Sequence, residues 1–175
     1  MSERETIERV KEKQGILAKA QNLFGAGYAN KEDLRELDKK LRDLYYDDFK
    51  KLRHRWEEIY LAALNIGKAS DDFKKVVQII DRVAEKVNHA DYGYAGLMDR
   101  KGAIRETELA RVFNYDKTLS EDIEAMTKAV SELYDDSQAE RWTEASTKAR
   151  NIKSLILSFE SKWDEREQQF RPTEA

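Results

Sequence analysis

The 175-residue chain contains no cysteine, only one proline and seven glycines. Without cysteine it can form no disulfide, no thiolate-ligated zinc site and no thiol nucleophile. Proline and glycine, the residues that interrupt helices, are scarce. Charged residues make up 38% of the sequence and apolar residues 40%. This combination is typical of long helices whose exposed faces carry ion pairs. The composition predicts an all-α fold, and no stretch of the sequence indicates a β-strand.

Long apolar runs are also missing from the sequence. No run of about 18 apolar residues is present, so we expect no transmembrane helix and no membrane partner. The N-terminal residues MSERETIERV are too polar for a signal peptide, which makes the cytoplasm the expected location. The net charge of −3 argues against a general binder of nucleic acids or anionic membranes.

Histidine is scarce as well, and neither His54 nor His89 suggests a catalytic centre. A Ser-His-Asp triad needs a histidine beside a carboxylate in a cleft, and nothing in the sequence points to one. The residues three positions before the histidines are Lys51 and Lys86, so the Glu-x-x-His pattern of di-iron bundles is absent. The sequence predicts no catalytic residue, metal ligand or cofactor. An enzyme would have to use the glycine- and tyrosine-rich segment Tyr92–Arg100.

The strongest pattern in the sequence is one long amphipathic helix over residues 31–66. Its apolar residues recur every three or four positions, within an arc of about 140°, as expected of a core-facing stripe. They include Leu34, Leu37, Leu41, Tyr45, Phe49, Leu52, Trp56 and Ile59. Asn30 stands where an N-cap is expected, and Gly67 suits the position after the C-terminus. A helix this long needs partner helices or a second copy of the chain to bury its stripe.

Five further helices complete the predicted fold, and the segments that should form them cover most of the remaining chain. We expect helices at about residues 3–24, 71–88, from within 89–102 to about 113, 120–134 and 138–170. Capping boxes at Thr118/Glu121 and Ser137/Glu140 mark the starts of the last two. Short connections favour antiparallel neighbours. We therefore predict one domain over residues 1–175, an antiparallel bundle of about six helices with coiled-coil-like packing and a frayed tail at 171–175.

One face of the long helix carries basic residues interleaved with a tyrosine. These residues are Lys39, Arg42, Tyr46, Lys50 and Arg53, about 120° away from the apolar stripe. Such a stripe could follow a phosphate backbone or bind an acidic protein surface. The alternative interpretation is a solvent-exposed face in which the cations form ion pairs with neighbouring carboxylates.

One carboxylate falls inside the apolar stripe of the same helix. Asp48 lies within the apolar arc, and Arg55 lies near its edge. An unpaired buried carboxylate is costly, so we expect Asp48 to pair with Arg55, Arg105 or a lysine of the first or last helix. Alternatively, Asp48 lies at the edge of the stripe and reaches water.

Acidic residues also occur in pairs four positions apart, at Asp43/Asp47, Glu132/Asp136 and Glu160/Asp164. This acidic-x-x-x-Asp pattern resembles the motifs of PhoU-like helical bundles. The resemblance implies a carboxylate bundle that binds metal. The other interpretation is a solvated helix face, because 35 acidic residues produce such pairs by chance.

Three functional hypotheses follow from these patterns. The first is a non-enzymatic helical interaction or scaffold protein that binds protein partners, among them a second copy of itself as a homodimer. The second is a nucleic-acid-associated module that uses the basic stripe from Lys39 to Arg53. The third is the PhoU-like metal-binding bundle.

Overall fold

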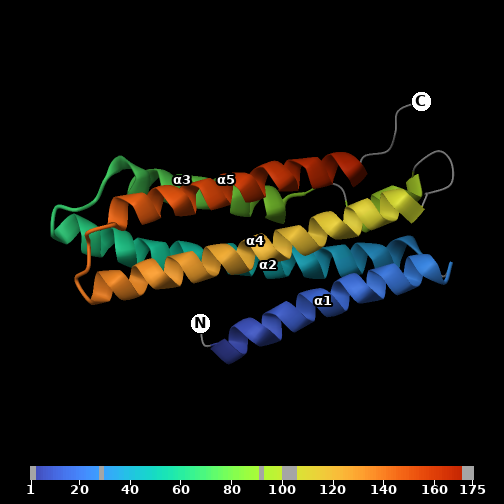
Figure 1. Cartoon of the computed structure of the whole chain (residues 1–175). Helices are drawn as coiled ribbons and strands as arrows, with labels where there is room; N and C mark the ends of the chain where they lie inside the picture. Colours follow the sequence, from blue (N-terminus) through green and yellow to red (C-terminus); the bar gives the residue numbers. More distant parts are fainter. Residues whose placement is uncertain (1–2, 28–29, 91–92, 100–105, 171–175) are drawn as a thin grey trace. The chain divides into compact units, whose positions relative to one another are not determined.

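A computed structural model describes residues 3–27, 30–90, 93–99 and 106–170 of this protein (Figure 1). The described residues are all helical and contain no strand. The five α-helices are α1 (Glu3–Gly25), α2 (Lys31–Asn65), α3 (Asp71–Asn88), α4 (Glu106–Gln138) and α5 (Ala145–Phe170), and a 3₁₀ helix, η1 (Tyr94–Asp99), precedes α4. None of the helices in the described ranges combines the length and apolar character needed to cross a membrane. The predicted frayed tail at 171–175 and the residues Tyr92, Arg100 and Arg105 lie outside the described residues.

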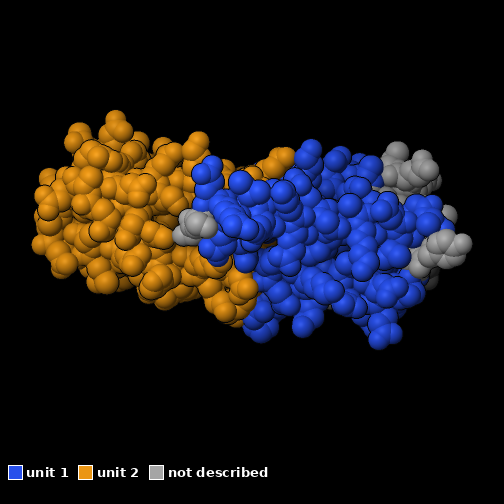
Figure 2. All heavy atoms as spheres, turned by 90° about the horizontal axis from the view of Figure 1, so that it is seen from below, with its two compact units in different colours: residues 1–44, 88–120, 162–175 blue, residues 45–87, 121–161 orange. Residues whose placement is uncertain are grey.

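The chain divides into two compact units, which Figure 2 colours separately. Unit 1 comprises residues 1–44, 88–120 and 162–175, and unit 2 comprises residues 45–87 and 121–161. Helices α2, α4 and α5 each contribute residues to both units, whereas α1 and η1 belong to unit 1. The expectation of a single domain stays a prediction.

Helix α2 agrees with its prediction to within one residue. At its start, the side-chain oxygen of Asn30 accepts a hydrogen bond of 2.8 Å from the amide of Asp33, which confirms the N-cap. At its end, Gly67 has φ of 69°, and the amide of Lys68 donates to the carbonyl of Ala63 at 2.8 Å. This is a Schellman motif, which glycine allows because it adopts the left-handed conformation without a Cβ clash.

Helix α4 is continuous, so the predicted break at residues 114–118 is wrong (Figure 1). The segment contains no glycine or proline, and buried residues recur through it at helical spacing: Val112, Asp116, Leu119 and Ile123. The Thr118 hydroxyl donates to the carbonyl four residues earlier at 2.8 Å, an intrahelical bond, instead of capping a new helix. The two predicted helices are therefore one, and the described residues form five α-helices where about six were expected.

Helix α5 begins at Ala145, seven residues later than predicted. The predicted capping box failed because the Ser137 hydroxyl donates to the carbonyl of Tyr134 at 2.6 Å, within the last turn of α4. Glu140, with φ of 57°, then ends α4, and the amide of Arg141 donates to a carbonyl five residues earlier at 2.8 Å. This Schellman motif contains no glycine, and the sequence therefore gave no indication of it.

Aromatic side chains fill the interior of unit 2. The indole nitrogen of Trp56 donates to the carbonyl of Phe73 at 2.8 Å, and the two rings lie 5.4 Å apart. Phe159 of α5 meets Phe49 of α2 edge to face, with ring centroids 5.0 Å apart, and Tyr45 at 6.1 Å. These contacts join α2 to α3 and to α5 through fully buried residues, as the apolar stripe predicts.

Ion pairs between α3 and α5 show in which direction the two helices run relative to each other within unit 2. Asp72 near the start of α3 bonds to Lys153 at 2.6 Å. Further along both helices, Arg82 bonds to Glu160 through two N–H groups at 2.9 and 2.6 Å. Because residue numbers rise together along both helices, α3 and α5 run parallel. The antiparallel expectation, which was drawn from short connections, does not extend to this pair.

Candidate functional site

The predicted basic stripe begins in unit 1 with Lys39 and Arg42. Lys39 is exposed, and its ammonium lies 3.8 Å from Asp43. Arg42 is mostly buried: its Nε donates to Asp38 at 2.9 Å, and its Nη1 donates to the carbonyl of Asn88 at 3.2 Å. The hydrogen bonds of Arg42 are therefore made mainly inside unit 1 and not on its surface.

The rest of the stripe lies in unit 2, along a hollow of about 230 Å³ between α2 and α3. The Lys50 ammonium lies 4.7 Å from the centre of the Tyr46 ring, a cation–π contact. Arg53 donates from Nε to Asp81 and from Nη1 to Glu57, each at 2.5 Å.

The wall of this hollow is both apolar and charged. Its apolar lining residues are Phe49, Ile80 and Ala84, all of them buried. The charged members are Lys50, Arg53, Asp81 and Glu85, two of each sign. The hydrogen bond and charge of Asp81 raise the pKa of Arg53, so the guanidinium keeps its charge. A wall with balanced charge suits a polar or apolar protein surface better than it suits a phosphate backbone.

The structure extends the stripe beyond the residues that the sequence identified. At 100° per residue, Glu57, Leu61 and Leu64 fall on the same side of α2 as Tyr46 and Lys50, within an arc of about 80°. Leu61 is 59% exposed and Leu64 is 49% exposed. The sequence reading missed them because an apolar residue in an amphipathic helix is expected in the core. We call the six residues Tyr46, Lys50, Arg53, Glu57, Leu61 and Leu64 the α2 face of unit 2.

Asp48 and Arg55, which were predicted as a candidate buried pair, lie in different surroundings in unit 2. Asp48 is buried, at 3% exposure, as its place in the apolar arc predicts, and it does not lack an interaction partner. Arg55 instead lies over the ring of Tyr134, 4.1 Å from its centroid, with Glu58 at 3.9 Å. The side chain of Arg55 is partly exposed at the surface of unit 2.

Unit 1 contains a buried ionic cluster that the sequence reading did not identify. It consists of Asp38, Arg42, Tyr94, Asp116 and Arg166, and we call it the Arg166 cluster. Arg166 is 0% exposed and bridges the aspartates: Nε donates to Asp116, and Nη2 donates to Asp38 at 2.7 Å. The Tyr94 hydroxyl also donates to Asp116. The two arginines and two aspartates balance in charge, which is what makes their burial tolerable.

Aromatic rings surround the same guanidinium. Its carbon lies 4.5 Å from the ring centroid of Phe170, 4.8 Å from that of Trp163 and 5.6 Å from that of Tyr94. The Nη1 group of Arg166 has no hydrogen-bond acceptor. Cation–π attraction to these rings partly offsets the missing bond, because the ring faces carry negative charge density. The cluster therefore depends on Arg166 both as an ion and as a packed planar group.

Burial shifts the pKa values in the Arg166 cluster. Loss of water raises the pKa of Asp116 above its ordinary 3.8, and the opposing influence of Arg166 and of the Tyr94 hydrogen bond does not cancel this effect. Burial alone would lower the pKa of Arg166, but the charges of Asp116 and Asp38 outweigh it and raise that pKa. Burial, followed by the charge of Asp116, also raises the pKa of Tyr94, so its hydroxyl keeps the proton that it donates.

Glycines allow η1 to approach the Arg166 cluster. A Cβ on Gly93 would lie 2.2 Å from the carboxyl carbon of Asp38, and one on Gly96 would lie 2.5 Å from the carbonyl oxygen of Phe170. The described part of the segment Tyr92–Arg100 therefore packs closely against the buried ions of the Arg166 cluster. Tyr94, its central aromatic residue, is 0% exposed.

The sequence did contain a signal for the Arg166 cluster. Asp38 falls inside the apolar arc of α2, just as Asp48 does. Arg166 stands three residues after Trp163 and four before Phe170, on the buried side of α5. Asp116 occupies the same kind of position in α4, but the predicted loop at 114–118 concealed it. Charged residues on the apolar faces of three different helices are the sequence pattern that indicates this buried cluster.

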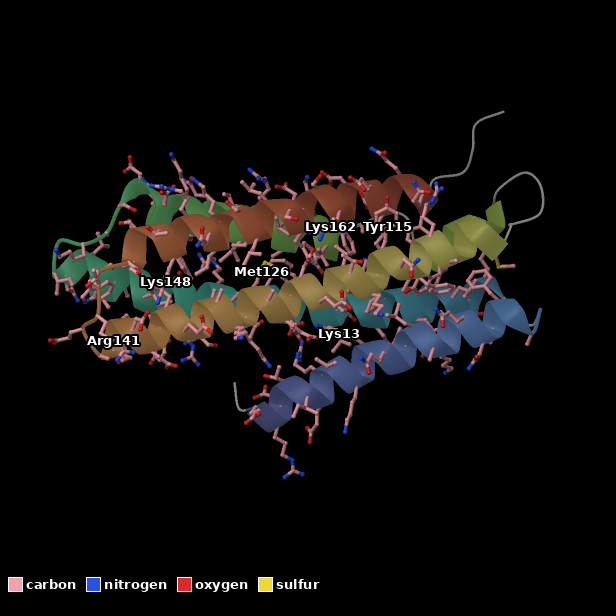
Figure 3. The ribbon with its side chains drawn as sticks, in the orientation of Figure 1. Lys13, Tyr115, Met126, Arg141, Lys148 and Lys162 are labelled. Atoms are coloured by element: carbon pink, nitrogen blue, oxygen red, sulfur yellow. The ribbon has the colours of Figure 1, made fainter. Side chains whose placement is uncertain are left out.

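A shallow groove of about 630 Å³ lies between α4 and α5 in unit 1. Its walls include Arg111, Tyr115, Lys162 and Glu165, and Figure 3 labels Tyr115 and Lys162. The Tyr115 hydroxyl donates to Glu165 at 3.0 Å, and this hydrogen bond raises the pKa of Tyr115. The groove offers mixed charges to solvent and a hydroxyl already engaged in a bond.

Two carboxylates of the acidic pairs that resemble PhoU-like motifs, Asp136 and Glu160, lie beside cations in unit 2. Asp136 bonds to Arg141 at 2.9 Å and to Lys148, both labelled in Figure 3. Glu160 bonds to Arg82 and, at 2.9 Å, to Lys86. In the part of the chain that the structure describes, no three histidine, aspartate or glutamate side chains gather in the way that a metal ion requires.

Comparisons with protein-family models, with curated proteins and with solved structures give no match to this chain.

Proposed function

We propose that this protein is a non-enzymatic helical interaction protein, or scaffold, that acts through protein–protein contacts. The α2 face of unit 2 carries the proposal, because over about five helical turns it presents an aromatic ring, both signs of charge and two exposed leucines. Tyrosine and arginine are enriched at protein interfaces, and interface energy concentrates in such side chains around small hollows.

The nucleic-acid hypothesis is the rival explanation of this face. Phosphate recognition depends on cations whose charge is free to replace counterions. Arg53, however, is bonded to two carboxylates, and the hollow contains as many anions as cations. A salt-dependent shift with RNA or DNA that is abolished by Lys50→Glu with Arg53→Glu would favour the rival.

The proposal includes the finer features of the fold. We propose that sequentially connected helices pack as antiparallel pairs with coiled-coil-like contacts, so that the long helices act as stiff supports. A stiff helix holds the side chains of its exposed face at fixed spacing, which lowers the entropy cost of binding.

Photocrosslinking tests the proposed function directly. A photoreactive phenylalanine analogue replaces Leu61, and the protein is irradiated in extract from the organism that supplies the sequence. Ser158 of α5, which is also exposed in unit 2, is the matched control position. We expect protein adducts from position 61 and none of them from position 158. Equal adducts from both positions, or none from position 61, would overturn the proposal.

A further inference from the structure

We infer that the α2 face of unit 2 is self-complementary and binds the same face of a second copy of this chain in antiparallel orientation. The inference rests on the proposed function and specifies its partner. It follows from the order of side chains along one helix: a hollow lies near the N-terminal end of the face, and exposed leucines lie near its C-terminal end.

The hollow has the size of a side-chain socket. Its volume of about 230 Å³ is below the range of about 300–1,000 Å³ typical of small-molecule sites. Its apolar wall is formed by Phe49, Ile80 and Ala84, and the ring of Tyr46 lies beside them. An aliphatic side chain inserted there would contact the ring of Tyr46 and this apolar wall, beside the four charged groups that also line the hollow. An aliphatic side chain can serve as an anchor in a pocket of this kind.

The same helix supplies that anchor. Leu61 and Leu64 are exposed on the side of α2 that bears the hollow, between about 12 and 27 Å further along the helix axis than the residues that line it. A helix that carries a socket at one end of a face and an anchor at the other can dimerise about a two-fold axis. Each anchor then enters the socket of the other copy, which is the isologous arrangement of most homodimers.

One register satisfies the whole face. When two copies of α2 lie antiparallel so that Tyr46 of one is opposite Leu64 of the other, Lys50 comes close to Leu61. In the same register Arg53 of each copy lies opposite Glu57 of the other, so opposite charges meet twice. The steps from 46 to 64 are four, three, four, four and three residues, which is close to the spacing of a heptad seam and departs from it once, at Leu61. The aliphatic stem of Lys50 covers Leu61 while its ammonium stays in water.

The order of charges distinguishes this partner from others. Reading the face from either end of the antiparallel pair gives the same sequence of contacts: aromatic on apolar, cation on anion, apolar on aromatic. A parallel pairing would place Arg53 beside Arg53 and Glu57 beside Glu57, which like-charge repulsion disfavours. The balanced charge of the hollow also removes the long-range repulsion that opposes association of identical surfaces.

Cysteine crosslinking tests the register, and the absence of native cysteine makes the result unambiguous. The variant Lys50→Cys with Leu61→Cys changes two exposed positions that this register places opposite each other. Within one chain the two positions are about 16 Å apart along the helix, too far for a disulfide. We expect mild oxidation to give a covalent dimer of twice 20.5 kDa. The single variant Lys50→Cys is the control and should stay monomeric under denaturing, non-reducing conditions.

Sedimentation equilibrium of the unmodified chain over a wide concentration range tests the association itself. We expect a reversible monomer–dimer equilibrium that Leu61→Glu with Leu64→Glu weakens at least tenfold, while the matched variant Ser154→Glu with Ser158→Glu leaves it unchanged. A monomer at all concentrations, or a dimer that the leucine variant does not weaken, would overturn the inference. If the chain is monomeric but position 61 still crosslinks to another protein, the proposed function stands and only the identity of the partner is wrong. If neither occurs, both fail.

Discussion

Replacement of Arg166 by methionine tests whether the Arg166 cluster stabilises unit 1. Methionine approximates the length of the side chain and removes its charge, which leaves the buried carboxylates of Asp38 and Asp116 without the guanidinium that bridges them. Breaking a fully buried ion pair by removing one partner costs about 3–5 kcal/mol. A typical domain is stabilised by about 5–15 kcal/mol in total, so we expect a large fall in the free energy of unfolding.

Urea denaturation, followed by circular dichroism and tryptophan fluorescence, measures this loss. Arg150→Met is the matched control, because Arg150 lies in the same helix with a side chain 67% exposed and its Nε 3.8 Å from Asp72. Exposed ion pairs contribute at most about 1 kcal/mol, so the control should change the free energy of unfolding by no more than that. A second variant combines Arg166→Met with Asp116→Asn. It should recover part of the loss, because one unpaired buried charge is removed with its partner.

The pH dependence separates electrostatics from lost packing. Burial already raises the pKa of Asp116, and Arg166 acts to lower it. Loss of Arg166 therefore raises the pKa of Asp116 in the folded protein further. As the pH falls through that raised value, the folded variant takes up a proton and no longer holds an unpaired carboxylate, so the cost of the substitution shrinks. A loss below about 1 kcal/mol at neutral pH, or a loss that stays the same in acid, would refute an ionic role for Arg166.

Three further predictions concern the same two units. Tyr94→Phe removes a hydroxyl that donates to buried Asp116, and it should lower the free energy of unfolding by about 1–3 kcal/mol in urea titrations. Glu160→Gln should lower stability at neutral pH and flatten the acid limb of the stability–pH curve. The hydrogen bond from its arginine partner holds the pKa of Glu160 below 4.5, so its contribution is present above that value and is lost as the pH falls through the lowered pKa. Gly93→Ala should lower the melting temperature, because its Cβ would overlap an aspartate of the Arg166 cluster, whereas Gly15→Ala, with no atom within 4 Å of the added carbon, should raise stability by about 0.5–1 kcal/mol. Equal melting temperatures for the two glycine variants would contradict the close approach at Gly93.

Helix position was readable from the sequence wherever apolar periodicity and a special residue agreed. The ends of α2 and α3 were predicted to within one residue, since Asn30 and Gly67 supply a cap and a left-handed turn that few other residues replace. Boundaries failed where a hydroxyl was taken as a cap. Thr118 and Ser137 both bond backwards to carbonyls within α4, and nothing in the local sequence separates that use of a hydroxyl from capping.

The candidate sites were readable only in part, for two physical reasons. The basic stripe could be placed on one side of α2, but Asp81, one of the two carboxylates bonded to Arg53, belongs to α3 and required the fold. Leu61 and Leu64 are exposed outside the apolar arc of α2, where their apolar residue type gives no sign of a binding surface. The Arg166 cluster joins residues 128 positions apart in the chain, so its pairing required the fold.

The two units hold their carboxylates in opposite electrostatic situations. In unit 1, Asp116 is withdrawn from water, and burial raises its pKa even beside Arg166. In unit 2, Asp72, Asp136 and Glu160 accept hydrogen bonds from cations, and these bonds lower their pKa values. As the pH falls, Asp116 in unit 1 is protonated first, which removes the cost of burying its charge. Below the ordinary carboxyl pKa, the carboxylates of unit 2 are protonated in turn, and their stabilising ion pairs are lost. The pH dependence of stability therefore differs between the two units. Burial disfavours the charged carboxylate in unit 1, whereas cations stabilise the charged carboxylates in unit 2.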